Sequence, residues 1–147
     1  MSPEELYEEG AFLLFKQRFD EALDYFNRAI EADPKLVKAL HARAVIYLRF
    51  ERLDEAEKDL LAALEVEPSN ARLYYRLGQV YYRKKDLEKA LESFNKAIDL
   101  EPLYAAAFMA RSQVYRDLGQ EDLADIDLDK AVSIQKATAQ AKKIVDF

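Results

Sequence analysis

Hydrophobic and polar residues follow one another along this chain in a pattern that predicts pairs of α-helices joined by short turns. In residues 71–85, apolar or small side chains recur at the spacing of one helix face: Tyr74, Leu77, Gly78 and Tyr81. A second set with helical spacing follows: Leu87, Ala90, Leu91, Phe94 and Ile98. Asp86 is a suitable N-cap for this second helix. Pro102 ends it near Glu101, because the residue before a proline avoids the α conformation.

The same pair of helices recurs at an interval of 34 residues. Three of the four prolines mark this interval: Pro34, Pro68 and Pro102. The block Ala90-x3-Phe94-x2-Ala97 that precedes the third proline has counterparts beginning at Ala22, Ala56 and Ala124. The fourth copy has Lys136 where the others have proline. A fixed period of this length predicts a stacked array, in which each helix pair buries its apolar face against its neighbours.

The third copy resembles the tetratricopeptide repeat, with Tyr74 at the position of the usual tryptophan. The other copies match less fully; in the first, Glu9 replaces the usual apolar residue before Gly10. The resemblance implies an all-α fold, a right-handed superhelical α-solenoid of antiparallel helix pairs. We expect one domain over residues 1–147, with repeats at about 3–36, 37–70, 71–104 and 105–138.

The remaining segment, 139–147, follows a last helix that has no proline to end it. That helix either continues unbroken or restarts as a short C-terminal helix. The segment holds an apolar patch of Ile144, Val145 and Phe147 beside lysines. Because a terminal repeat needs a cover over its open face, we expect this segment to cap the array. A tail that binds a partner is the alternative.

Composition argues against an enzyme or a nucleic-acid-binding protein. The chain has no cysteine, three glycines and a single histidine, His41, so neither a metal site, a catalytic triad nor a glycine-rich phosphate loop can be assembled. We therefore expect no catalysis and no cofactor. The net charge of −6 disfavours nucleic acid, and no apolar run is long enough for membrane insertion. No signal peptide is visible, so we expect a cytoplasmic protein.

Charge is divided between the two helices of each pair. The first helices with their flanking residues carry a net charge of +8, whereas the second helices carry −16. The resemblance implies that first helices line the concave face of the array. A basic groove backed by an acidic convex surface is the result.

The predicted groove residues combine cations with aromatic and apolar side chains. These are the types enriched where binding energy concentrates. The predicted set is Tyr7, Phe15, Lys38, His41, Arg49, Arg72, Tyr75, Arg76, Gln79, Tyr82, Arg83 and Met109. For Tyr75 and Tyr82, packing between repeats is an equal alternative. The groove predicts an adaptor or scaffold that binds a peptide or helix of another protein, with acidic residues and apolar anchors.

Two other functions stay open at this stage. A homo-oligomer assembled through the C-terminal segment or the convex face is the first. The second is a co-chaperone-like protein that binds acidic chaperone C-termini. Arg72 and Arg76 match in type the carboxylate clamp of one subfamily that binds chaperone C-termini, but Tyr7, Ala11 and Ala42 stand where its lysine and asparagines would be. Chaperone-tail binding is therefore the weakest of the three.

Overall fold

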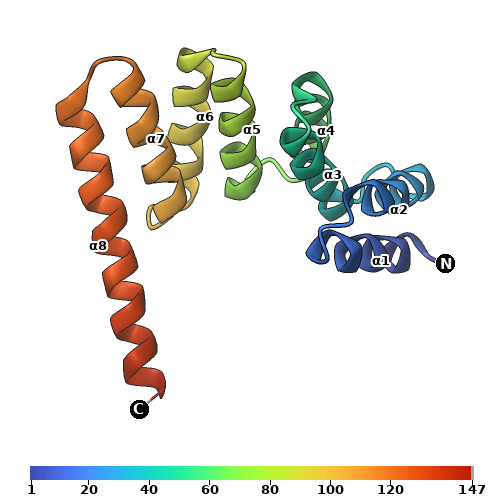
Figure 1. The fold of residues 1–147 in the computed structure, drawn as a ribbon. Coiled ribbons are helices and arrows are strands. Elements are labelled where there is room, and N and C mark those ends of the chain that lie inside the picture. The colour runs from blue at the N-terminus through green and yellow to red at the C-terminus, as the bar shows by residue number, and fades with distance from the viewer. Residues whose placement is uncertain (147) are drawn as a thin grey trace. The chain divides into compact units, whose positions relative to one another are not determined.

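The computed structural model describes residues 1–146, and within them the regular structure is entirely α-helical. The eight helices of this range are α1 (Pro3–Phe15), α2 (Phe19–Ala32), α3 (Val37–Arg49), α4 (Leu53–Val66), α5 (Ala71–Arg83), α6 (Leu87–Leu100), α7 (Ala105–Asp117) and α8 (Glu121–Asp146) (Figure 1). Each predicted repeat is a pair of helices, so the all-α solenoid class is confirmed. None of these helices has both the length and the apolar character that crossing a bilayer requires.

Local sequence signals explain where several helices begin. Before α1, the Ser2 hydroxyl accepts a hydrogen bond from the Glu5 backbone N–H at 3.1 Å, and the Glu5 carboxylate accepts one from the Ser2 N–H at 3.2 Å. Pro3 occupies the first helical position, where its missing N–H costs nothing. At the start of α6, the Asp86 carboxylate accepts from the Lys89 N–H at 3.1 Å. The predicted N-cap is thus confirmed.

The turn inside each helix pair uses one residue with a left-handed backbone. These residues are again 34 positions apart: Gln17 (φ 62°), Glu51 (φ 58°), Lys85 (φ 64°) and Gly119 (φ 77°). Only the last is a glycine, the residue type that adopts this conformation without steric cost. The same turn therefore recurs in each helix pair. It reverses the direction of the chain after the first helix, so the two helices of a pair run antiparallel.

Packing divides the chain within α5 into unit 1, Met1–Arg76, and unit 2, which begins at Leu77. The core of unit 1 joins α1, α2 and α3. One cluster contains Leu6, Ala29, Leu36 and Ala39, and another contains Leu13, Ala22, Phe26 and Ile46. Ala29 on α2 meets the start of α3, whereas Phe26, earlier on α2, meets Ile46 near the end of α3. The two neighbouring helices therefore run antiparallel.

Buried ion networks, which the sequence analysis did not anticipate, join successive repeats. In unit 1, Arg43 of α3 donates from Nε and Nη2 to both carboxylate oxygens of Asp59, at 2.8 and 2.7 Å. Its Nη1 donates to Asn27 Oδ1 of the preceding repeat at 3.0 Å. In unit 2 the same three bonds link Arg111 to Asp127 and Asn95. The carboxylates accept two charge-assisted bonds each, which makes their burial tolerable.

The last helix differs from the expected cap. With Lys136 in place of a proline, nothing interrupts the helix, and α8 runs unbroken to Asp146. Figure 1 shows α8 continuing past its neighbour α7, and side chains 139–144 are exposed. These residues therefore extend α8 instead of folding back over the last repeat. Of the predicted apolar patch, Ile144 is 76% exposed, while the Val145 side chain and Phe147 lie outside the described residues.

Candidate functional site

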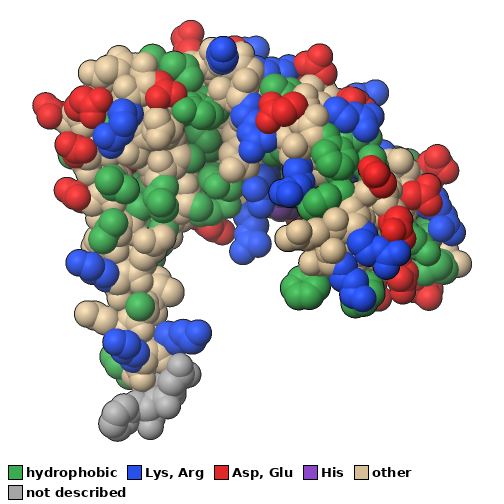
Figure 2. All heavy atoms as spheres, in the orientation of Figure 1, with side chains coloured by type: hydrophobic (Ala, Val, Ile, Leu, Met, Phe, Trp, Pro, Cys, Tyr) green, Lys and Arg blue, Asp and Glu red, His purple; other side chains and the backbone are tan. Residues whose placement is uncertain are grey.

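The predicted groove residues lie on first helices and fall into both units. Eight belong to unit 1: Tyr7 and Phe15 on α1, Lys38, His41 and Arg49 on α3, and Arg72, Tyr75 and Arg76 on the start of α5. Four belong to unit 2: Gln79, Tyr82 and Arg83 on the rest of α5, and Met109 on α7. The two groups are described separately below. Figure 2 shows how Lys and Arg side chains are distributed over one face of the chain.

Lys38 has an internal partner that the sequence analysis missed. Its Nζ lies 2.6 Å from the Glu4 carboxylate, and both side chains are about half exposed. The same ammonium lies 5.2 Å from the centre of the Tyr7 ring. The hydrogen bond that the ammonium donates to Glu4 raises the pKa of Lys38, so this lysine stays charged. Lys38 and Tyr7 thus lie beside each other, and the Lys38 ammonium already pairs with a carboxylate of its own chain.

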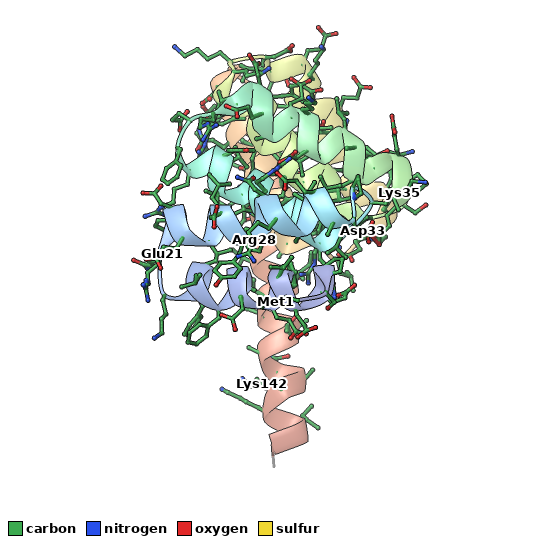
Figure 3. The ribbon with its side chains drawn as sticks, turned by 90° about the vertical axis from the view of Figure 1, so that its right-hand side faces the viewer. Met1, Glu21, Arg28, Asp33, Lys35 and Lys142 are labelled. Carbon is green, nitrogen blue, oxygen red and sulfur yellow. The ribbon has the colours of Figure 1, made fainter. Side chains whose placement is uncertain are left out.

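His41 lies among cations in unit 1. Burial, followed by the positive charges of Arg76 and Arg72, lowers the pKa of His41 to about 4. Its Nε2 is buried and has no hydrogen-bond partner among the described residues. The ring borders an open hollow of about 500 Å³, whose lining is Lys35, Leu36, Val37, Lys38, His41, Val66, Glu67 and Asn70. Figure 3 shows Lys35 in the turn after Asp33, where the Asp33 carboxylate accepts from its N–H at 3.1 Å.

The lowered pKa of His41 predicts a pH-dependent stability. Between about pH 6.5 and pH 4 the unfolded chain binds a proton on this histidine, whereas the folded chain does not. The free energy of unfolding should therefore fall as the pH drops through this range, by about 1–2 kcal/mol, since part of the ring reaches solvent. Urea unfolding of the wild type and of His41→Gln at pH 7 and pH 4.5 measures this. Equal losses in both proteins would contradict the prediction.

Arg49 packs on an aromatic ring, whereas Phe15 is exposed to solvent. The Arg49 guanidinium lies over the Phe19 ring of α2, 4.4 Å from its centre, and Phe19 packs edge-on against Phe50. Arg49 therefore covers neighbouring aromatic surface in addition to carrying charge. Phe15 ends α1 and is 86% exposed, so it is available to a ligand.

In unit 2, Tyr82 takes part in packing between repeats. Its hydroxyl donates to Asp117 Oδ2 at 2.5 Å, and the Gln113 amide donates to Asp117 Oδ1 at 2.9 Å. These bonds lower the pKa of Asp117, with Tyr82 as the larger cause. The bond to Asp117 in turn raises the pKa of Tyr82. The contact ties the end of α5 to the end of α7. Met109, on the same face of α7 as Gln113, is exposed.

The residues that sequence reasoning missed are mostly acidic or aromatic partners of the predicted cations. Glu4, Phe19 and Asp117 each hold one of the predicted residues in place. Glu4 and Lys38 are 34 residues apart and so occupy the same position in successive repeats. Residues at one repeat position recur as neighbours in a stacked array. A comparison of charges between equivalent positions would therefore have indicated this pair.

Solved structures of the protein MamA have a similar fold. A crystal structure of MamA matches with a TM-score of 0.85 at 22% identity, over 94% of this chain and 81% of that chain. The structure of MamA residues 41 to the end from Desulfovibrio magneticus RS-1 has a TM-score of 0.84 at 24% identity, over 92% of this chain and 77% of that chain. At such identities the match shows a common fold.

Family comparison covers most of the chain. Sequence models described as tetratricopeptide repeat match residues 3–36, 41–102 and 105–138, while comparison with curated proteins gives no significant match. The first and last of these ranges coincide with the first and fourth repeats predicted from the 34-residue period. Stacked repeats of this kind act by presenting extended binding surfaces, which indicates a role in protein interaction or as a scaffold. The chain belongs to the tetratricopeptide repeat family.

Proposed function

We propose that this chain is a non-enzymatic adaptor that binds an acidic peptide or helix with apolar anchors along the first helices of unit 1. The main support is the environment of His41, because Arg72 and Arg76 lie close enough to lower its pKa. Within unit 1, His41 of α3 therefore lies near two arginines at the start of α5. Arg72 is exposed, and the Arg76 guanidinium lies 5.4 Å from the centre of the Tyr75 ring.

The cationic and the aromatic side chains would have different roles in binding. Arg72, Arg76 and Lys38 would attract carboxylates and set the position of the ligand along the helices. Phe15 and Tyr75 would bury its apolar anchors. In exchanging Glu4 for a ligand carboxylate, Lys38 would keep one ion pair, so the exchange costs little. A preformed array avoids the ordering cost of assembling such a surface on binding. A cytoplasmic location stays a prediction.

Reversing the charge of Arg72 and Arg76 tests this proposal. Peptides selected from a displayed random library on the wild type should be rich in Asp and Glu with apolar anchors. Arg72→Glu with Arg76→Glu should weaken their binding at least about tenfold in fluorescence anisotropy at low salt. Lys58→Glu with Lys96→Glu is the matched control, since it makes the same charge change on exposed residues of second helices. Peptides that bind both double variants equally well would place the site elsewhere.

Self-association is the second candidate function, supported by apolar side chains exposed on α8. Ile126, Val132 and Ile144 are 62%, 40% and 76% exposed. If α8 mediates assembly, the full-length chain should form oligomers in sedimentation, and a chain ending at Thr138 should show a lower mass. Monomers in both cases would favour the adaptor. Oligomers that survive the truncation would move the interface away from residues 139–147.

A further inference from the structure

The last repeat leaves uncovered a helix face that earlier repeats bury. Leu128 of α8 is 39% exposed, whereas the residues at the same position of the preceding second helices, Phe26, Leu60 and Phe94, are 0–1% exposed. In unit 1, Ile46 of the following first helix covers Phe26. Among the described residues, α7 is the helix that packs against α8. The opposite side of Leu128 and the neighbouring Val132 is therefore open to another helix.

The residue at the centre of this face differs from its counterparts in charge. In two earlier repeats an asparagine occupies this position, and its side-chain oxygen accepts from an arginine of the next first helix. Arg43 donates to Asn27 at 3.0 Å, and Arg111 donates to Asn95 at 2.9 Å. The last repeat has Asp129 at the same position. A carboxylate binds a guanidinium more strongly than an amide oxygen does.

We propose that this open face of α8 binds a helix of another protein that carries an arginine opposite Asp129. The two first helices that dock in this way define the pattern around the arginine. Each has an alanine four residues before it, Ala39 or Ala107, and a β-branched residue three residues after it, Ile46 or Val114. All four are fully buried. This surface lies on a second helix and goes beyond the function proposed for the first helices.

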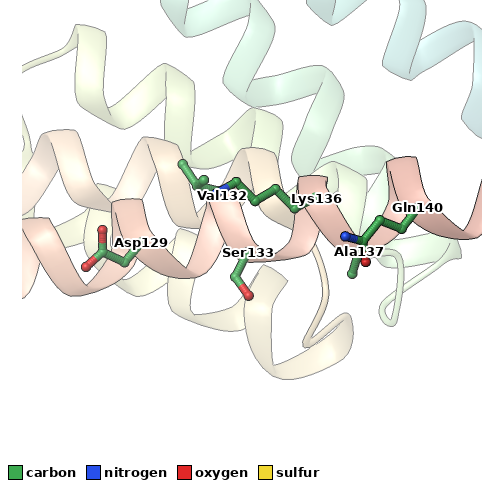
Figure 4. Close-up of a pocket in the computed structure, with 6 residues that line it drawn as sticks. All are labelled: Asp129, Val132, Ser133, Lys136, Ala137 and Gln140. Carbon is green, nitrogen blue, oxygen red and sulfur yellow. The ribbon is translucent and has the colours of Figure 1, made fainter.

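The direction of the docked helix follows from the packing of the earlier repeats. Because α2 and α3 run antiparallel, a helix docked on α8 would place its N-terminal end beside the end of α8. An open hollow of about 470 Å³ runs along α8 there, lined by Asp129, Val132, Ser133, Lys136, Ala137 and Gln140 (Figure 4). Figure 4 shows the Lys136 side chain running back toward Val132, and Figure 3 shows Lys142 projecting from the last turns.

Charge changes along this surface in a defined direction. Figure 2 shows acidic side chains over the beginning of α8, hydrophobic ones further along and basic ones toward its end. The docked helix should accordingly have acidic residues before its arginine. Acidic residues in the first turns of a helix also favour the helix itself. The expected partner is thus an amphipathic helix whose first turns are acidic. After these turns it should carry a small residue four positions before the arginine and a Val or Ile three positions after it.

A second copy of this chain fits the face poorly. Its open first helix, α1, has Phe12 at the position of Ile46, and Phe12 is 54% exposed. However, α1 has Glu9 at the position of Arg43 and Arg111. Docking α1 on α8 as the next repeat would place Glu9 beside Asp129, and like charges at that distance repel. Because α1 lacks the arginine that Asp129 would bind, we expect the docked helix to come from a different protein.

A helical peptide with the α7 sequence provides a direct test. The probe is residues 105–117, crosslinked through positions 109 and 113, which lie away from the Ala107, Arg111 and Val114 stripe. It should bind the full chain in fluorescence anisotropy, and Asp129→Lys should weaken binding at least about tenfold. Arg111→Glu in the peptide should weaken binding to the wild type similarly. Combining both changes should restore binding, because the charges are then exchanged.

The control is Glu65→Lys, the same charge change at an exposed position of another second helix, α4. It should leave peptide binding within about twofold of the wild type. Absence of binding at millimolar peptide, or failure of the exchanged charges to restore it, would overturn the proposal. Sedimentation of Asp129→Lys provides an independent readout. If this variant self-associates less than the wild type, a second copy occupies the face and the proposed partner is wrong; an unchanged mass supports it.

Discussion

Replacing Asp59 with alanine is expected to lower the free energy of unfolding by about 3–5 kcal/mol. The Asp59 side chain is 5% exposed and its partner, Arg43, is 20% exposed. The two hydrogen bonds that Arg43 donates to Asp59 would be lost without replacement, since Asn27 already accepts from the third nitrogen of the guanidinium. A buried, uncompensated positive charge is the main cost. Urea unfolding followed by circular dichroism measures the loss. A change below 1 kcal/mol would show that water reaches the guanidinium.

The third repeat supplies the matched control for this experiment. At the positions of Arg43 and Asp59 it has Leu77 and Ser93, both buried. We therefore expect Arg43→Leu with Asp59→Ser to recover most of the stability that Asp59→Ala loses, because no charge then remains buried. Replacing both members of a buried ion pair with residues that pack well is often neutral. If the double variant is as unstable as Asp59→Ala, the cost comes from lost packing and not from the unpaired charge.

The 34-residue period made the fold predictable, whereas the networks around Arg43 and Arg111 were hidden by that period. Small residues such as Ala22 and Ala29 recur in all four repeats because every helix pair needs the same close contacts. The arginine recurs only after 68 residues, with Leu77 between the two copies. A comparison of all four repeats therefore does not count this arginine among their shared residues. Its interval still matches that of Asn27 and Asn95, so a comparison of alternate repeats would have found it.

The candidate site was less predictable than the fold because side-chain partners depend on details that periodicity does not contain. The pattern placed Lys38 and Tyr82 correctly on first helices. It did not show that Glu4 pairs with Lys38 or that Asp117 accepts from Tyr82. Such contacts depend on the distance between neighbouring helices and on rotamers. Whether the last helix continues past Lys136 could not be predicted for a different reason. The absence of a proline at this position permits a continuous helix but does not require one.

Truncating Phe26 to alanine is expected to lower the free energy of unfolding by about 3–5 kcal/mol. Phe26 is fully buried and packs between Leu13, Ala22 and Ile46. Its ring also lies directly over Gly10, where a Cβ atom would come within 2.6 Å of a ring carbon. The large side chain therefore fills space that the glycine leaves, and its removal creates a cavity that rigid helices cannot close. Thermal and urea unfolding both report this loss.

The second repeat shows how the same space can be filled by a different pair of residues. Ala44 and Leu60 stand there at the positions of Gly10 and Phe26, and Leu60 is also fully buried. Gly10→Ala alone should destabilise the chain by about 1–3 kcal/mol, because the added methyl group collides with the ring. Gly10→Ala with Phe26→Leu should be more stable than either Gly10→Ala or Phe26→Ala, since the smaller leucine makes room for the methyl group. A double variant less stable than both would mean that unit 1 needs the ring for contacts that leucine cannot make, such as the tilted contact between Phe26 and Tyr7 at 5.8 Å.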